Sequence, residues 1–185
     1  MSFIRRHTPI TLWTTDLAQP SAGRLLVAGD LLLAPTQEPA RPPWHGALQA
    51  LSLTDGSRRW QKSFEYALVS GLAQPCEGPW SSQGLVLVTT SSTDLLRGEG
   101  ELLALDAAGE ERWRWAPGAQ RVSAPAVSAD LACVTVDTRT LVLLNLASGT
   151  ERTTIDLAAG ASRAAPALQR RTWPTCPVVA RTCWP

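Results

Sequence analysis

The sequence predicts an all-β fold built from repeated units, and three observations support that class. Fourteen Pro and 13 Gly interrupt the 185 residues, so that no stretch of about 11 residues keeps a clean helical period. Short apolar runs alternate with Gly-containing turns over most of the chain. Eight Trp stand against two Phe and one Tyr, an excess that a packing position repeated along the chain explains.

Three segments carry the same strand–turn–strand pattern. In each, an apolar strand leads into a turn with Gly and then into a strand rich in charged residues. The segments are residues 50–60, 104–113 and 143–153. Their turn glycines, Gly56, Gly109 and Gly149, lie 53 and 40 residues apart, a spacing typical of propeller blades.

A second strand–turn–strand element precedes each of these segments, at residues 25–33, 83–88 and 123–136. The two elements together give four antiparallel strands per unit, which is the form of a propeller blade. We therefore predict a partial β-propeller of about three four-stranded antiparallel blades plus the start of a fourth. We expect an N-terminal extension over residues 1–9 and blades over residues 10–64, 65–116, 117–157 and, incomplete, 158–168.

Three blades and part of a fourth do not close the usual ring of four to eight blades. The first and last sheets of such an arc each keep one uncovered apolar face. Further blades or a second chain would cover those faces. We therefore interpret the chain as a fragment of a larger propeller protein.

The last 17 residues, 169–185, break the repeat. They contain three Pro, two Cys and two Trp but no Gly and no acidic residue, a composition that suits neither strand nor turn. Residues 157–185 hold four Arg and no acid, whereas residues 1–156 hold 13 basic and 16 acidic groups. We favour a shifted reading frame or a premature end near residue 168; the alternative is a disordered basic tail.

These segments resemble the quinoprotein-type repeat of the PQQ-like β-propeller family, whose motif runs Ala-x-Asp-x-x-Thr-Gly-Lys-x-x-Trp. Residues of the first and second segments match it, the second with one deletion: Ala50, Gly56 and Trp60, then Ala104, Asp106, Gly109 and Trp113. Thr153 stands where the third Trp is expected. The resemblance covers roughly residues 10–168 and implies that the Trp of each unit packs between blades, where a large flat side chain can cover the gap between two sheets.

Charge and cysteine placement exclude several classes of protein. Seventeen basic and 16 acidic residues give a net charge of +1, which leaves no surplus to neutralise nucleic-acid phosphates. Four scattered cysteines and two His (Cys76, Cys133, Cys176, Cys183, His7, His45) show no metal-ligand spacing. We therefore predict no metal site, no cofactor and no nucleic-acid partner.

The N-terminal sequence shows no apolar region of signal-peptide length behind its basic start. No apolar run reaches the roughly 18 residues that a membrane span needs. We expect a cytoplasmic protein, although the family that the sequence resembles has periplasmic members.

The candidate binding site lies in the loops between the second and third strands of each unit. Alternating strand direction places these loops on one face, where propellers bind their partners. The loop from Pro35 to Gly46 is long and contains Arg41, Trp44 and His45, which we predict to form a partner-binding loop. Trp44 folded back as a cap on its blade is an equally good interpretation.

The favoured function is a non-catalytic module for protein–protein interaction, because no catalytic residue can be nominated. No Ser–His or Cys–His arrangement points to a hydrolase. A fragment of a pyrroloquinoline-quinone-dependent dehydrogenase is the alternative that the resemblance implies, but the adjacent Cys pair of that family is missing. The propeller lipoprotein of the outer-membrane barrel-assembly machine is a further relative, and the signal and lipidation Cys expected of it are not seen.

Overall fold

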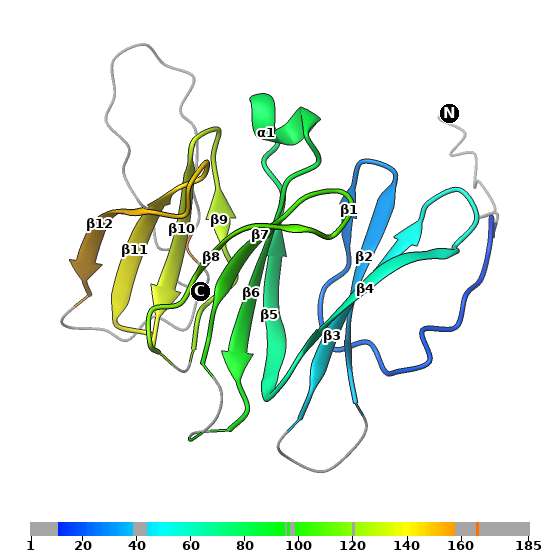
Figure 1. The fold of residues 1–185 in the computed structure, drawn as a ribbon, viewed down its shortest axis with the longest axis horizontal. Helices are drawn as coiled ribbons and strands as arrows, with labels where there is room; N and C mark the ends of the chain where they lie inside the picture. Colours follow the sequence, from blue (N-terminus) through cyan, green and yellow to red (C-terminus); the bar gives the residue numbers. More distant parts are fainter. Residues whose placement is uncertain are drawn as a thin grey trace, which may run out of the picture.

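A computed structural model of the protein describes residues 11–38, 44–94, 96, 99–119, 121–157 and 166. Within these residues the chain forms three four-stranded sheets side by side (Figure 1). The first sheet contains β1 (Leu26–Ala28), β2 (Leu31–Gln37), β3 (Gly46–Ser52) and β4 (Arg58–Phe64). The second contains β5 (Ala67–Ala73), β6 (Val86–Ser92), β7 (Leu102–Leu105) and β8 (Glu111–Trp115). The third contains β9 (Ala126–Val127), β10 (Leu131–Val136), β11 (Thr140–Asn145) and β12 (Glu151–Asp156).

Each strand pairs antiparallel with the next strand of its sheet, and the described sheets do not close into a ring. The predicted fold class is therefore confirmed. The one helix among the described residues is a single turn, α1 (Pro79–Ser82), in the connection from β5 to β6. No helix in the part of the chain that the structure describes is long and apolar enough to cross a membrane.

The repeat in the sequence appears as a repeated irregularity in the sheets. The pairing of the third and fourth strands shifts register between Ala50 and Leu51, between Ala104 and Leu105, and between Leu143 and Leu144. These three pairs open the three aligned segments. A bulge at a fixed position twists the outer strand in the same way in every sheet.

The inner strands of the second sheet, β6 and β7, are buried on both faces over most of their length, and their residues 86–88 and 102–105 are continuous apolar runs for that reason. Successive side chains of a strand point to opposite faces. In β6, Val86 and Val88 therefore pack toward the first sheet, whereas Leu87 packs toward the third. The molecule thus has two cores, one on each side of the second sheet.

The outer face of the first sheet differs from the expected uncovered surface. Residues 11–22, drawn in dark blue, run across it (Figure 1). The indole Nε1 of Trp13 donates to the carbonyl oxygen of Leu53 at 2.7 Å, and Nε2 of Gln49 donates to the carbonyl oxygen of Leu17 at 2.8 Å. Gln49 and Leu51 are each only 3% exposed as a result.

The third sheet, at the far end of the described residues, has an exposed outer strand. All six residues of β12 are exposed, and Ile155 among them keeps 45% of its surface accessible. The predicted start of a fourth blade and the tail at 169–185 lie outside the described residues, apart from Pro166.

Candidate functional site

The predicted binding loop is shorter than the sequence indicates. Pro35 and Thr36 belong to β2 and pair with Leu48 and Ala47 of β3, so the connection covers residues 38–45. Trp44 and His45 lie at its end. Arg41, the third predicted site residue, lies outside the described residues.

Trp44 and His45 are held by two other connections on the same face. The hydroxyl of Thr93, in the β6–β7 connection, donates to the carbonyl oxygen of Trp44 at 2.8 Å. The amide of Thr93 in turn donates to the carbonyl oxygen of Tyr66 at 2.8 Å. Tyr66 lies in the two-residue connection from β4 to β5, so three connections from two sheets meet here.

His45 and Tyr66 form the second contact of this group. Their ring centroids lie 5.0 Å apart with planes tilted by 51°, a favourable geometry for two π systems. The amide of Tyr66 donates to Nδ1 of His45 at 3.4 Å. Trp44 keeps 37% of its surface exposed. We call Trp44, His45, Tyr66 and Thr93 the loop-face cluster.

Sequence reasoning found half of the loop-face cluster. Tyr66 and Thr93 were missed, although strand alternation places the β4–β5 connection on the same face as the long loops. Tyr66 is the one Tyr of the chain, and its φ of 56° is unusual for a bulky residue. Within the described residues, no group of three or more His, Cys, Asp or Glu is arranged to hold a metal ion.

The packing role predicted for Trp60 and Trp113 is confirmed. Nε1 of Trp60 donates to the carbonyl oxygen of Ala107 in the turn of the second sheet, at 2.9 Å. Nε1 of Trp113 donates to the carbonyl oxygen of Leu146 in the turn of the third, also at 2.9 Å. Each indole therefore joins one sheet to the turn of the next.

The turn glycines give these indoles their space. A Cβ added at Gly109 would lie 2.6 Å from the ring of Trp60, and one at Gly149 would lie 2.5 Å from the ring of Trp113. Trp13 repeats the arrangement on the first sheet, where a Cβ at Gly56 would lie 2.6 Å from its ring. Trp13 was not recognised in the sequence because no strand pattern surrounds it.

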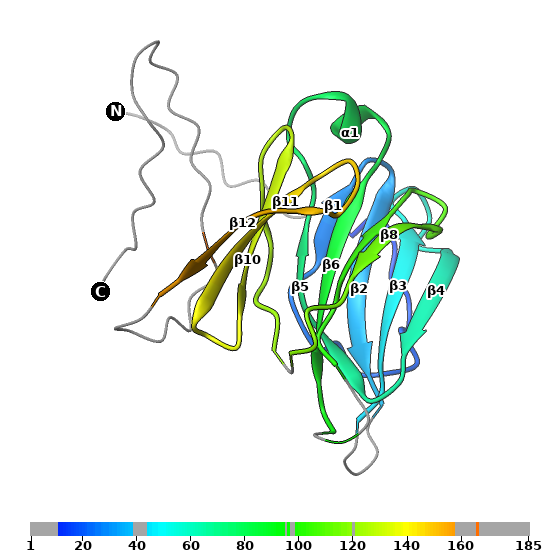
Figure 2. The same cartoon turned by 60° about the vertical axis from the view of Figure 1, so that its left-hand side comes forward.

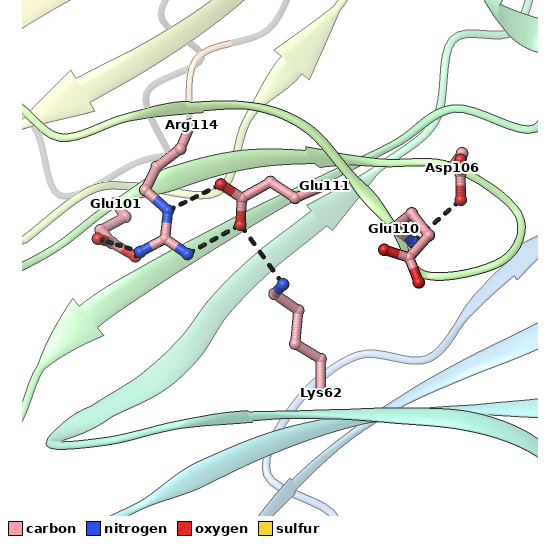
Figure 3. A network of polar contacts seen from close by, with 6 residues as sticks. All are labelled: Lys62, Glu101, Asp106, Glu110, Glu111 and Arg114. Atoms are coloured by element: carbon pink, nitrogen blue, oxygen red, sulfur yellow. Dashed lines mark hydrogen bonds and ion pairs between the residues drawn. The ribbon is translucent and has the colours of Figure 1, made fainter.

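A network of charged groups connects the outer strands of the first two sheets (Figure 3). Arg114 of β8 binds Glu111 through Nη2 at 2.8 Å and Glu101 through Nη1 at 3.0 Å. Nζ of Lys62, in β4, lies 3.4 Å from the same Glu111 carboxylate. The hydrogen bond from Arg114 holds the pKa of Glu111 below its ordinary value of 4.5.

Two other titratable groups serve the fold. The hydroxyl of Ser57 donates to Asp55 at 2.7 Å, and this bond and the backbone amide of Ser57 lower the pKa of Asp55 to about 2. Burial raises the pKa of the Cys133 thiol to about 11, so Cys133 stays a protonated, apolar core residue. Neither group adds a reactive centre to the loop-face cluster.

Comparison with known proteins places these sheets in a family. The sequence pattern of the family described as outer membrane protein assembly factor BamB matches residues 44–172, which is 129 of the 185 residues. Among curated proteins, none matches.

Three solved structures that are similar to the chain are one natural protein and two computationally designed ones. BamB from Moraxella catarrhalis is similar at a TM-score of 0.52 and 18% identity, over 78% of this chain and 39% of that one. The computationally designed Ika4 protein is similar at a TM-score of 0.61 and 14% identity, over 89% of this chain and 88% of that one. The computationally designed Ika8 protein is similar at a TM-score of 0.54 and 13% identity, over 80% of this chain and 39% of that one.

The chain thus spans 39% of the length of BamB from Moraxella catarrhalis. Its repeated bulges, its indole–glycine contacts and the match over residues 44–172 agree with one another. The chain belongs to the family of the outer membrane assembly factor BamB, as a part of a PQQ-like β-propeller.

Proposed function

We propose that the protein is a non-catalytic propeller module that binds a protein partner through the loop-face cluster. The observation that supports this most directly is the position of Trp44. The residue is 37% exposed, while its backbone carbonyl accepts a hydrogen bond from the Thr93 hydroxyl of the neighbouring sheet. An aromatic side chain on a rigid backbone loses little entropy on binding, which is why Trp and Tyr dominate binding hot spots.

The surroundings of Trp44 suit a protein surface better than a small molecule. His45 and Tyr66 add a ring pair that offers both apolar area and polar atoms. The hydroxyl and backbone groups nearby are already engaged within the cluster. A partner would therefore bind by covering an aromatic patch with a polar rim, the usual anatomy of a protein interface.

A role in outer-membrane protein assembly is the more specific candidate, and the family match favours it. The family is described by that activity, and the chain spans 39% of the Moraxella protein. The cytoplasmic location expected from the sequence stays a prediction. It conflicts with a role in outer-membrane protein assembly, which requires a location in the cell envelope. Fractionation of the source cells with an antibody against the chain separates an envelope location from a cytoplasmic one.

Site-specific photo-crosslinking tests the binding face. Benzoylphenylalanine at position 44 is expected to give a discrete crosslinked adduct in the source cells. The same group at position 58, on the outer strand β4, is the matched control because Arg58 is equally at the surface but remote from the loops.

The comparison has two informative results. One result is an adduct from position 44 whose yield falls in the Tyr66→Ala or Thr93→Ala variant. That result supports the loop-face cluster as the binding surface. Equal adducts from positions 44 and 58, or none from position 44, would count against it.

A further inference from the structure

A cavity of about 260 Å³ lies between the second and third sheets, on the side opposite the loop-face cluster. It is at the end of the sheets where α1 lies (Figures 1 and 2). Its lining consists of two indoles, an ion pair, one amide and aliphatic groups: Trp80, Trp113, Asp106, Arg112, Gln83, Leu85, Leu146 and Ala147. All of these residues lie in the described second and third sheets or in the connections between their strands.

A departure from the repeat creates this cavity. In the first sheet, Gly29 and Asp30 alone connect the first two strands. In the second sheet the same connection runs from residue 74 to residue 85 and contains α1. That insertion brings Trp80 to the core between the second and third sheets, where Trp113 also packs.

The insertion is held in place by its own hydrogen bonds. The amide of Leu85 donates to the carbonyl oxygen of Trp80 at 3.1 Å, and the hydroxyl of Ser82 donates to that of Pro79 at 2.8 Å. A Cβ at Gly78 would lie 3.6 Å from the carbonyl oxygen of Ala129 in the third sheet. Trp80 is therefore presented by a turn that packs on the neighbouring sheet.

The polar side of the cavity has an ion pair, Asp106 and Arg112, whose two side chains differ in exposure to solvent. Oδ1 of Asp106 accepts from the amides of Ala108 at 2.9 Å and Glu110 at 3.0 Å, the second of which Figure 3 shows. Its Oδ2 lies 3.2 Å from Nε of Arg112. These donors satisfy the carboxylate, whose side chain is 19% exposed, whereas that of Arg112 is 63% exposed. Within the described residues, the terminal amino groups of Arg112 make no further ion pair.

We propose that this cavity binds one aromatic side chain of a partner peptide, with an acidic residue next to it in the peptide sequence. The ring would lie against Trp80 and Trp113, and the carboxylate would bind the terminal amino groups of Arg112. The volume of about 260 Å³ is below the roughly 300–1,000 Å³ that is usual for small-molecule pockets, so it suits one side chain better than a cofactor. A guanidinium can bind a carboxylate through two parallel hydrogen bonds, so the positive charge of Arg112 favours an acidic residue in the peptide.

The test uses two capped peptides, acetyl-Gly-Phe-Glu-Gly-amide and its Phe-Gln counterpart, titrated into ¹⁵N-labelled protein. We expect the indole N–H signals of Trp80 and Trp113 to shift, while that of Trp44 stays in place. We expect the Phe-Glu peptide to bind about threefold more tightly than the Phe-Gln peptide, because the Arg112 side chain is 63% exposed and solvent screens its attraction to the carboxylate.

Variants separate the two halves of the site. Trp80→Ala should weaken the Phe-Glu peptide about tenfold or more, and its thermal unfolding shows whether it folds. Arg112→Gln should remove the preference for Phe-Glu and leave the ring contact. Arg59→Gln is the matched control, since Arg59 precedes Trp60 as Arg112 precedes Trp113.

Three results would overturn the proposal. They are unmoved indole signals at millimolar peptide, equal affinity for the two peptides in the native protein, and tighter binding of N-acetylphenylalanine than of the peptide. The last result would assign the cavity to a small carboxylate. Trp44→Ala should leave peptide binding unchanged, so this outcome is independent of the loop-face cluster.

Discussion

At the scale of single residues, the contact between an indole and a turn glycine decides how neighbouring sheets fit. Gly109 and Gly149 have positive φ values of 83° and 69°, and each lies directly under a Trp of the preceding sheet. A side chain there would meet both backbone strain and a ring that has no room to move. The glycine of the repeat is thus a packing position as much as a turn position.

Replacing Gly149 by Ala tests this double requirement, with Gly118→Ala as the control. Both glycines have a φ of 69°, but nothing lies within 4 Å of a Cβ at Gly118. We expect Gly118→Ala to lower the free energy of unfolding by about 1 kcal/mol and Gly149→Ala by about 2–4 kcal/mol. Urea denaturation measures the free energy of unfolding of both variants. Equal decreases would show that the Trp113 ring moves aside for the added methyl group at no cost in stability.

Residue identity alone could predict part of this picture. Trp60 and Trp113 were predictable because each stands a fixed distance after a turn glycine. Trp13 stands in a segment without strand pattern, and Tyr66 stands in a connection of two residues. Their roles depend on which segments meet in space, which a local pattern does not contain.

At the scale of elements, β4 and β8 are joined by charge across the sheet boundary. Lys62 of β4 and Arg114 of β8 share the Glu111 carboxylate (Figure 3). The carboxylate is 30% exposed, so solvent screens the attraction and its net contribution to stability is modest. A shared acceptor costs less side-chain entropy than separate pairs would.

The acid dependence of stability should report this network. Because the folded-state pKa of Glu111 is lowered, its contribution is present above the ordinary value of 4.5 and is lost as pH falls through the folded-state pKa. We expect Glu111→Gln to cost about 0.5–1 kcal/mol at pH 7 and progressively less below pH 4.5. Urea denaturation at several pH values measures this.

Glu110→Gln serves as the neighbouring control and should change the free energy of unfolding at pH 7 by less than about 0.5 kcal/mol. A loss in Glu111→Gln that stays constant down to pH 2 would mean that the side chain acts by packing and not by charge.

The elements themselves were largely predictable, and their exceptions have a clear cause. Continuous apolar runs predict β6 and β7, because a strand that is buried on both faces is apolar at most of its positions. Residues 74–85 read only as a loop, since Pro75, Pro79 and two glycines mask the single turn of α1. The cavity beside Trp80 therefore could not be foreseen.

At the scale of the whole molecule, residues 11–22 stabilise the first sheet as a blade would. Trp13 contacts Gly56 as Trp60 contacts Gly109. The stacking of the repeat therefore extends one step before β1. This explains why the first sheet is better covered than the third, whose outer strand β12 is exposed throughout.

Trp13→Ala tests that role, with Leu12→Ala as its control because Leu12 is 85% exposed. We expect Trp13→Ala to lower the free energy of unfolding by about 1–3 kcal/mol through lost burial and the lost bond to Leu53. Leu12→Ala should change it by less than about 0.5 kcal/mol. Equal effects would mean that the segment lies on the sheet without supporting it.

The indole contacts also set an order of events during synthesis. The hydrogen bonds of Trp13, Trp60 and Trp113 reach forward along the chain by 40, 47 and 33 residues. Each indole therefore stays exposed on the nascent chain until the ribosome has synthesised the turn whose carbonyl oxygen accepts its hydrogen bond. Contacts of such separation form slowly and leave apolar surface open to aggregation meanwhile. Folding of this chain should follow translation blade by blade, with the most recent Trp always the last to be covered.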